Sequence, residues 1–137
     1  MFCVYKYPSL GIKLSEGSVG QVKEWLYFKS IDVEIIIPPD KDFDIVPLMK
    51  DQLIVIMHSN HPLYEKDTIG IPDLQDEDIV LGRGGYEVQV HDLFKDFNLK
   101  PQIRFEVDYI DTALSVVQGG LGITITTKKT FYHCQNK

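Results

Sequence analysis

Apolar and polar residues recur along the chain at the spacings of regular secondary structure. Between Tyr86 and Phe97 the apolar positions return every three or four residues, which predicts an amphipathic helix. Over residues 31–37 isoleucine and valine occupy every second position, which predicts a strand ended by Pro38-Pro39. The unbroken apolar run at 53–57 predicts a further strand, and the His-Pro-Leu turn that follows stops it.

Shorter segments carry the same signals. Strands are predicted at 10–14, 79–81, 103–107 and 121–126, an extended segment at 43–49, and single helical turns or helix ends at 71–74 and 2–7. A helix is predicted after Ser18, which can form a capping box with Gln21 and precedes the apolar stripe Val19, Val22 and Leu26.

The ends of the two later helices are also marked in the sequence. Asn98 suits a left-handed C-terminal cap for the helix that follows Tyr86. Asp108 is predicted to cap the next helix, which Gly119-Gly120 stops. The inner face predicted for that helix is Tyr109, Ile110, Ala113, Leu114 and Val117.

The order of these elements predicts the fold class. Strands alternate with helices at both ends of the chain, around two middle strands that can pair antiparallel, and such alternation builds mainly parallel sheets flanked by helices. The sequence therefore predicts an α/β protein with two lobes. Residues 1–52 would form one lobe and 53–127 the other, while residues 128–137 show no periodicity and are predicted to be an irregular tail.

Composition narrows the function classes. The 137 residues are 44% hydrophobic and 25% charged, which is typical of a globular domain. The formal net charge of −6 argues against this chain gripping phosphate backbones by itself. No apolar run approaches a membrane span and the N-terminus is unlike a signal peptide, while Cys3 and Cys134 lack a disulfide framework, so we expect a reduced, cytoplasmic setting without membrane contact.

A glycine-rich loop is the best candidate for a binding site. Gly82-Arg83-Gly84-Gly85-Tyr86 leads from a predicted strand into a predicted helix, where free N–H groups and the helix dipole favour an anion. Arg83 could add a bidentate contact to a carboxylate. The alternative is a flexible turn with a solvated arginine, because glycine clusters first of all mark turns. A dinucleotide fingerprint is excluded, since Glu87 stands at its last glycine.

The other polar clusters in the sequence do not indicate a metal site or a catalytic site. His58 and His61 lie three residues apart in a turn without a nearby cysteine, which is poor evidence for a metal. The acidic run at 73–78 is expected to be a solvated face, because a calcium loop would need ligands in a different order. No nucleophile stands beside a base in a recognisable arrangement, so we expect no catalytic residues, no cofactor and no enzyme activity.

Several segments together resemble the effector-binding domain of LysR-type transcriptional regulators. They are Tyr7-Pro8 with Ile12-Lys13-Leu14-Ser15-Glu16-Gly17-Ser18; Ile31-Asp32-Val33-Glu34-Ile35; Pro47-Leu48 with Asp51-Gln52-Leu53 and His61-Pro62-Leu63; Asp73-Leu74; and Val117-Gln118-Gly119-Gly120-Leu121-Gly122-Ile123. No single motif is specific, but their order over residues 2 to 127 is the order of the family.

The resemblance implies a fold and a function. The fold would be the two-lobed, type 2 periplasmic-binding-protein-like architecture, and the function would be sensing a small effector, often a carboxylate, held between the lobes. The family's cleft is lined by the loop at Arg83, Gly84, Gly85 and Tyr86, and Ser18 and Thr126 are further candidate contacts. Homo-oligomers, dimers or tetramers, would be expected in an intact regulator. The alternative is a transport-type solute-binding protein of the same architecture.

The chain also departs from the family pattern. We expect it to be truncated at both ends, because the helix-turn-helix that reads DNA and the first strand of the first lobe are absent, as is the return to that lobe after Thr127. The first lobe would then be incomplete, and DNA would be contacted only through the absent helix-turn-helix. Lys29 stands where the family usually has a glycine that ends the helix.

Overall fold

The computed structural model describes residues 6–36, 41–83 and 86–135. Its contacts divide the chain into two compact units, residues 1–34, here called the N-terminal unit, and residues 35–137, called the sheet unit. The division lies before the boundary at residue 52 that the sequence suggested, and the assignment of residues to two lobes stays a prediction. The helix end predicted at 2–7 falls mainly outside the described residues.

The N-terminal unit contains one well-defined helix, α2 (Val19–Tyr27), and its predicted start is confirmed. The Ser18 hydroxyl accepts a hydrogen bond from the Gln21 N–H at 3.3 Å, and the Gln21 side-chain oxygen accepts from the Ser18 N–H at 3.0 Å. Lys29 ends the helix with φ 58°, so a non-glycine residue takes the left-handed position, and the Ser30 N–H donates to the Trp25 carbonyl at 2.8 Å.

Two strands predicted in this part of the chain are not formed. Residues 10–14 and the described part of 31–37 have no strand pairing, so both predictions are wrong. Their alternating residues remain open to solvent, and Val33 and Ile35 are 79% and 85% exposed. A period of two makes a strand only where a neighbouring strand completes the ladder.

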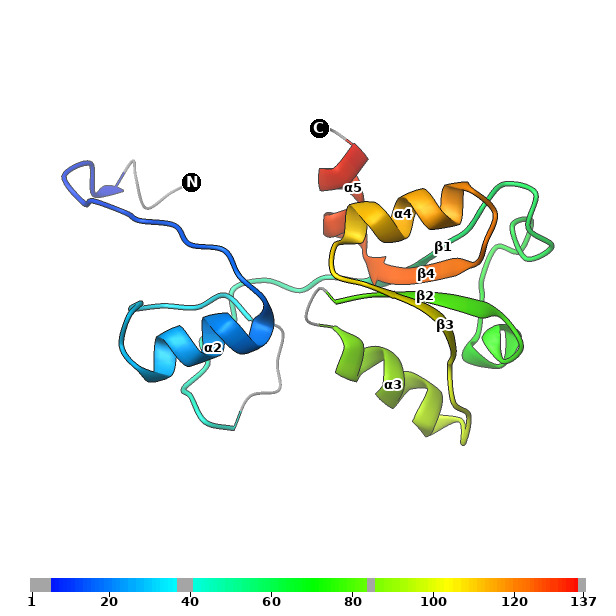
Figure 1. The fold of residues 1–137 in the computed structure, drawn as a ribbon, viewed down its shortest axis with the longest axis horizontal. Helices are drawn as coiled ribbons and strands as arrows, with labels where there is room; N and C mark the ends of the chain where they lie inside the picture. Colours follow the sequence, from blue (N-terminus) through cyan, green and yellow to red (C-terminus); the bar gives the residue numbers. More distant parts are fainter. Residues whose placement is uncertain (1–5, 37–40, 84–85, 136–137) are drawn as a thin grey trace. The chain divides into compact units, whose positions relative to one another are not determined.

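The sheet unit is built on a four-stranded sheet with the order β1-β4-β2-β3 (Figure 1). The strands are β1 (Leu53–Ile56), β2 (Asp78–Gly82), β3 (Gln102–Val107) and β4 (Ile123–Thr127). β2 is parallel to both β3 and β4, while β1 is antiparallel to β4, so the sheet is mixed but mainly parallel. A 3-10 turn, η1 (Ile71–Leu74), precedes β2 as predicted.

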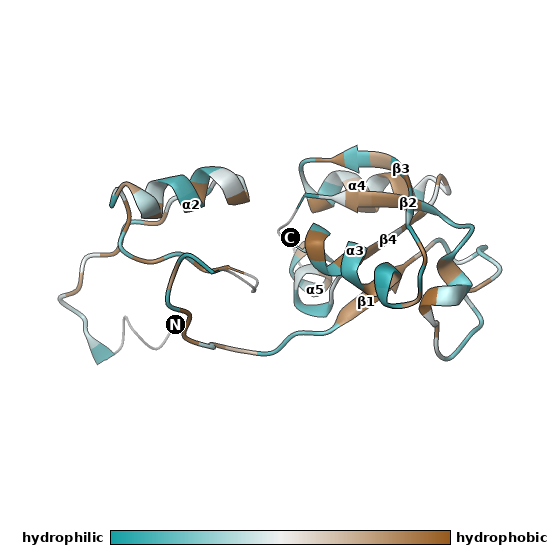
Figure 2. Cartoon of the chain, turned by 90° about the horizontal axis from the view of Figure 1, so that it is seen from below, coloured by the Kyte–Doolittle hydropathy of each residue, from teal (hydrophilic) through white to brown (hydrophobic). Residues whose placement is uncertain are grey.

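Two helices cover opposite faces of this sheet (Figure 1). On one face α3 (Glu87–Asp96) packs the fully buried Phe94 and Val90 against residues of β2 and β4. On the other face α4 (Ile110–Gln118) packs Ala113 and Val117 against Val80. Figure 2 shows the result in hydropathy, since strands that lie between the helices are largely brown and the edge strand β3 alternates.

Glycine fixes two positions around β4. A Cβ on Gly122 would lie 2.6 Å from the carbonyl oxygen of Asp78, so only glycine lets the start of β4 approach β2 this closely. Gly120 has φ 75° and completes the end of α4, as predicted from Gly119-Gly120. The left-handed cap predicted at Asn98 is also confirmed, with φ 56°.

Three further predictions need correction. Asp108 does not cap α4, whose N-cap is Tyr109 without a side-chain hydrogen bond. Tyr109 is not on the inner face either, because it lies in extended backbone before the first turn and is 74% exposed.

The third correction concerns the C-terminal tail, because residues 128–135 form helix α5 (Lys128–Gln135). Contacts distant in the sequence hold its start: Asp51 Oδ1 accepts from the Lys129 N–H at 3.3 Å, and the Lys128 N–H donates to the Gln52 carbonyl at 2.8 Å. Because these partners lie more than seventy residues away, the sequence around residues 128–135 does not reveal them.

Candidate functional site

The topology of the sheet unit singles out the carboxyl end of β2. From β2 the chain runs through α3 to β3 on one side, and then through α4 to β4 on the other side of β2. In open α/β sheets such a reversal of direction leaves the strand ends free to form a ligand crevice. The loop that the sequence suggested, residues 82–86, begins at this end of β2.

Arg83 is the charged residue of this loop, and it is already paired. Its Nη2 donates to Glu106 Oε2 at 2.9 Å, and its Nη1 lies 3.7 Å from Asp108 Oδ1. The Arg83 backbone N–H donates to the Val107 carbonyl at 2.9 Å. The hydrogen bond and charge of Glu106, followed by the charge of Asp108, raise the pKa of Arg83, so its positive charge is secure.

Glu106 and Asp108 are candidate site residues that the sequence reasoning missed, because both are ion-paired with Arg83. Both lie at the end of the strand predicted at 103–107, and the carboxyl ends of parallel strands meet at one edge of a sheet. The alternation Arg104-Phe105-Glu106 is visible in the sequence as a strand pattern. With the order of the strands in the sheet, this pattern would have placed the Glu106 side chain beside Arg83. Only the sheet order, with β3 next to β2, was lacking.

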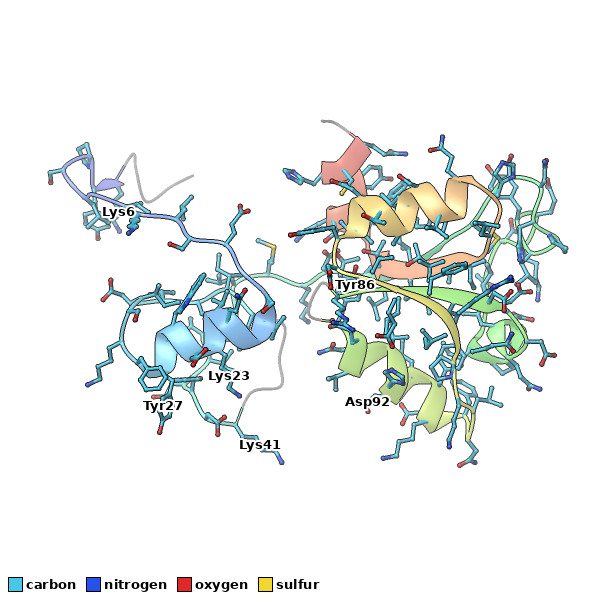
Figure 3. The ribbon with its side chains drawn as sticks, viewed as in Figure 1. Lys6, Lys23, Tyr27, Lys41, Tyr86 and Asp92 are labelled. Atoms are coloured by element: carbon cyan, nitrogen blue, oxygen red, sulfur yellow. The ribbon has the colours of Figure 1, made fainter. Side chains whose placement is uncertain are left out.

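Tyr86 and Thr126 are brought together as a buried hydroxyl pair. The Tyr86 Oη and Thr126 Oγ1 lie 2.9 Å apart, with either group able to donate, and the residues are 2% and 0% exposed. Burial raises the pKa of Tyr86, so the phenol stays protonated and able to hydrogen-bond. Figure 3 labels Tyr86 at the start of α3, and its contact with β4 ties the end of the loop to the sheet.

The remaining candidates cannot be joined to this group. Ser18 lies in the N-terminal unit, where its hydroxyl caps α2. Gly84 and Gly85 lie outside the described residues. The structure thus brings together Tyr86 and Thr126, and it places Arg83 beside two carboxylates at the end of β3. Ligand contact by any of the six predicted residues stays a prediction.

The two histidines of the His58–His61 turn serve the turn itself. His58 Nδ1 accepts from the Asn60 N–H and His61 Nδ1 from the Leu63 N–H, each at 3.1 Å. His61 Nε2 lies 2.8 Å from Glu77 Oε2. Within residues 6–36, 41–83 and 86–135, no three His, Cys, Asp or Glu side chains converge as a metal site would require. In the same residues, no helix has the length and apolarity needed to cross a bilayer.

Comparison with known proteins decides the family. The model of the LysR substrate binding domain matches residues 5–132. The chain belongs to the LysR substrate-binding domain family. Its relatives include the HTH-type transcriptional regulator YvbU of Bacillus subtilis, which is 36% identical over 123 residues, and the HTH-type transcriptional activator CmpR of Synechocystis, which is 27% identical over 124 residues.

Solved LysR effector-binding domains share the fold. The Synechocystis CcmR regulatory domain in complex with 2-PG superposes with a TM-score of 0.81 at 25% identity, covering 93% of this chain and 64% of that one. The BenM effector-binding domain with its effector benzoate superposes with a TM-score of 0.74 at 27% identity, covering 95% and 62%. The predicted α/β, type 2 periplasmic-binding-protein-like class is therefore confirmed.

The match covers only part of the relatives. The alignment includes 90% of this chain but 42% of YvbU, and 88% of this chain but 41% of CmpR. The chain thus spans less than half the length of these regulators and corresponds to a LysR substrate-binding domain region within them.

Proposed function

We propose that this LysR substrate-binding chain senses a small carboxylate that binds at the carboxyl ends of β2 and β4, beside Arg83. The observation that carries the proposal is the position of Arg83, whose charged, more than half exposed side chain stands at the end of β2, where the strand order reverses. A guanidinium offers a carboxylate two parallel hydrogen bonds. Benzoate, the effector of BenM, is a carboxylate, which supports this choice of ligand class.

The hydroxyl pair would hold the loop in place for binding. Because the Tyr86–Thr126 bond is buried, the loop end is fixed to β4 before any ligand arrives, and less ordering is needed on binding. The N-terminus of α3 would favour the negative end of the ligand.

The output would be a change of conformation without chemistry. A ligand that binds one arrangement of the domain better than another shifts the population toward it. In a complete regulator, which would be a homo-oligomer, that shift would alter how the helix-turn-helix reads DNA. The alternative of a transport-type solute-binding protein rests on the fold alone, whereas the matched relatives are transcriptional regulators.

Calorimetric titration with small carboxylates tests the proposal. The panel contains benzoate, 2-PG and a series of aliphatic and amino-substituted carboxylic acids. For whichever acid binds, Arg83→Gln should weaken affinity about 10- to 100-fold, the usual range for losing a charged hydrogen bond.

Arg104→Gln is the matched control for this experiment. Arg104 is as exposed as Arg83, at 55% against 58%, and it is paired with an aspartate at the opposite end of the same strand pair. This variant removes the same charge without touching the loop, so affinity should not change. Equal loss in both variants, or no loss in either, would contradict the proposed site.

A further inference from the structure

The surroundings of Arg83 contain more negative than positive charge. Glu106 and Asp108 are ion-paired with Arg83, and the charge of Glu87, in the first turn of α3, also acts on it. Three carboxylates therefore surround one guanidinium. A simple carboxylate would still be attracted by Arg83, but the three negative charges would weaken that attraction, because like charges at short range oppose binding.

Glu106 belongs to strand β3, and Asp108 follows directly after that strand, in the bend before α4. Glu106 is paired with Leu81 in the β2–β3 ladder, and Val107 is paired with Gly82. The Arg83 N–H bond to the Val107 carbonyl extends this ladder by one step. The backbone at Arg83 and Glu106, which carry opposite charges, is thus ordered before a ligand binds, and such ordering favours selective recognition.

The hydrogen-bonding capacity of these groups is only partly used. Arg83 directs Nη1 and Nη2 toward Asp108 and Glu106, and a guanidinium has five N–H donors in total. Each carboxylate has two oxygens with about four acceptor sites. The side chains of Glu106 and Asp108 are 52% and 76% exposed, so a second cation can reach them.

We infer that Glu106 and Asp108 determine ligand class, and that the effector carries a cationic amino group as well as a carboxylate, as an α-amino acid does. The ammonium, with three N–H donors, would bind Glu106 and Asp108, and the carboxylate would bind Arg83. A zwitterion matches both signs of charge at this edge, whereas its des-amino counterpart matches only one. The inference rests on the proposed function and narrows its ligand class.

Paired ligands test the inference on the whole 137-residue chain. Each of the standard amino acids is titrated beside the carboxylic acid that lacks its amino group, for example phenylalanine beside 3-phenylpropanoate and glutamate beside glutarate. The amino acid that binds should have an affinity about tenfold or more higher than that of its des-amino partner. This difference corresponds to one close charge contact in a solvated site. The corresponding amine without a carboxylate should bind more weakly than the amino acid.

Charge-neutralising variants locate the effect. Glu106→Gln combined with Asp108→Asn should remove the preference for the amino acid, and should leave the des-amino acid bound equally well or better. Asp92→Asn is the matched control, because Asp92 is an exposed carboxylate farther along α3 (Figure 3), and its loss should leave the preference unchanged. A thermal melt of each variant shows that the fold is retained.

The outcomes separate this inference from the proposed function. If des-amino acids bind as tightly as amino acids, or the double variant keeps its preference, the inference is wrong while carboxylate sensing stands. If amines bind without needing a carboxylate, or no carboxylate of either series binds, the proposed function is wrong and the inference falls with it.

Discussion

The two units of this chain show two ways in which a sequence makes structure. In the N-terminal unit, α2 has a complete capping box and a left-handed end, but no residue of the described range 6–34 is buried. In the sheet unit, Phe94, Val90, Ile79 and Ile123 are fully enclosed, although α3 and α4 start without side-chain caps. Local signals suffice to form a helix, but buried apolar area holds a fold together.

The largest expected effect comes from opening the core of the sheet unit. Phe94→Ala should lower its free energy of unfolding by about 3–5 kcal/mol, the usual cost of removing a buried aromatic ring. Trp25, the only tryptophan, lies in the N-terminal unit and reports on it by fluorescence, while circular dichroism follows mainly the sheet unit. In urea unfolding, the midpoint of the dichroism transition should move to a lower urea concentration, and the midpoint of the Trp25 fluorescence transition should stay the same.

Leu26→Ala provides the reverse variant in α2. Leu26 is only half-buried, so this change should alter the Trp25 signal and leave the dichroism transition of the sheet unit in place. If each variant moved both signals together, the two units would unfold as one cooperative structure, and the contrast between them would be wrong.

An intermediate effect is expected from the cap of α2. Ser18→Ala removes the acceptor for the Gln21 N–H and should destabilise the helix by about 1 kcal/mol. Because few buried contacts support α2, the loss should appear as lower helicity and faster amide exchange over residues 19–27. Ser115→Ala, in the middle of α4, removes a hydroxyl without removing a cap and should have little effect. Equal responses would show that the capping box does not hold α2.

The smallest effect is expected from acid. Hydrogen bonds from Arg104 and then Gln102 lower the pKa of Asp78 below its ordinary value of 3.8. A depressed carboxyl pKa adds stability that is present above the unfolded-state value and is lost as pH falls through the folded-state value. Wild type should therefore lose melting temperature below about pH 4, and Asp78→Asn should show a shallower loss. Asp96→Asn, an exposed acid on α3, should follow wild type. If the melting temperatures of Asp78→Asn and wild type fell in parallel with pH, the depressed pKa of Asp78 would not contribute to acid stability.

The contrast between the units also explains what the sequence could predict. The strand at Leu53–Ile56 and the helix ending before Asn98 follow from patterns within about ten residues, and both are confirmed. The strands expected at 10–14 and 31–37 are not formed, because pairing depends on a partner that local alternation does not specify. Helix α5 was missed for the same reason, since Asp51 caps it across the sequence.

The candidate site was predicted in part for a similar reason. Arg83 stood out because glycines flank it, and its location at the end of β2 agrees with that expectation. Its partners Glu106 and Asp108 lie more than twenty residues away, and only the strand order brings them close. The same order joins Thr126 to Tyr86, which the resemblance had put forward separately. The sequence was enough to identify candidate residues one by one. Which of them contact each other depends on the order of the strands in the sheet.

The pairing of β1 with β4 has a practical consequence for engineering. Leu53 lies opposite Thr127, and the Lys128 N–H bonds to the Gln52 carbonyl, so the chain enters and leaves the sheet at neighbouring positions. A segment whose two ends adjoin can be excised, inserted into a host loop, or circularly permuted with a short connecting peptide. Residues 53–127 therefore offer a segment whose ends can be joined to a host protein at one place on its surface.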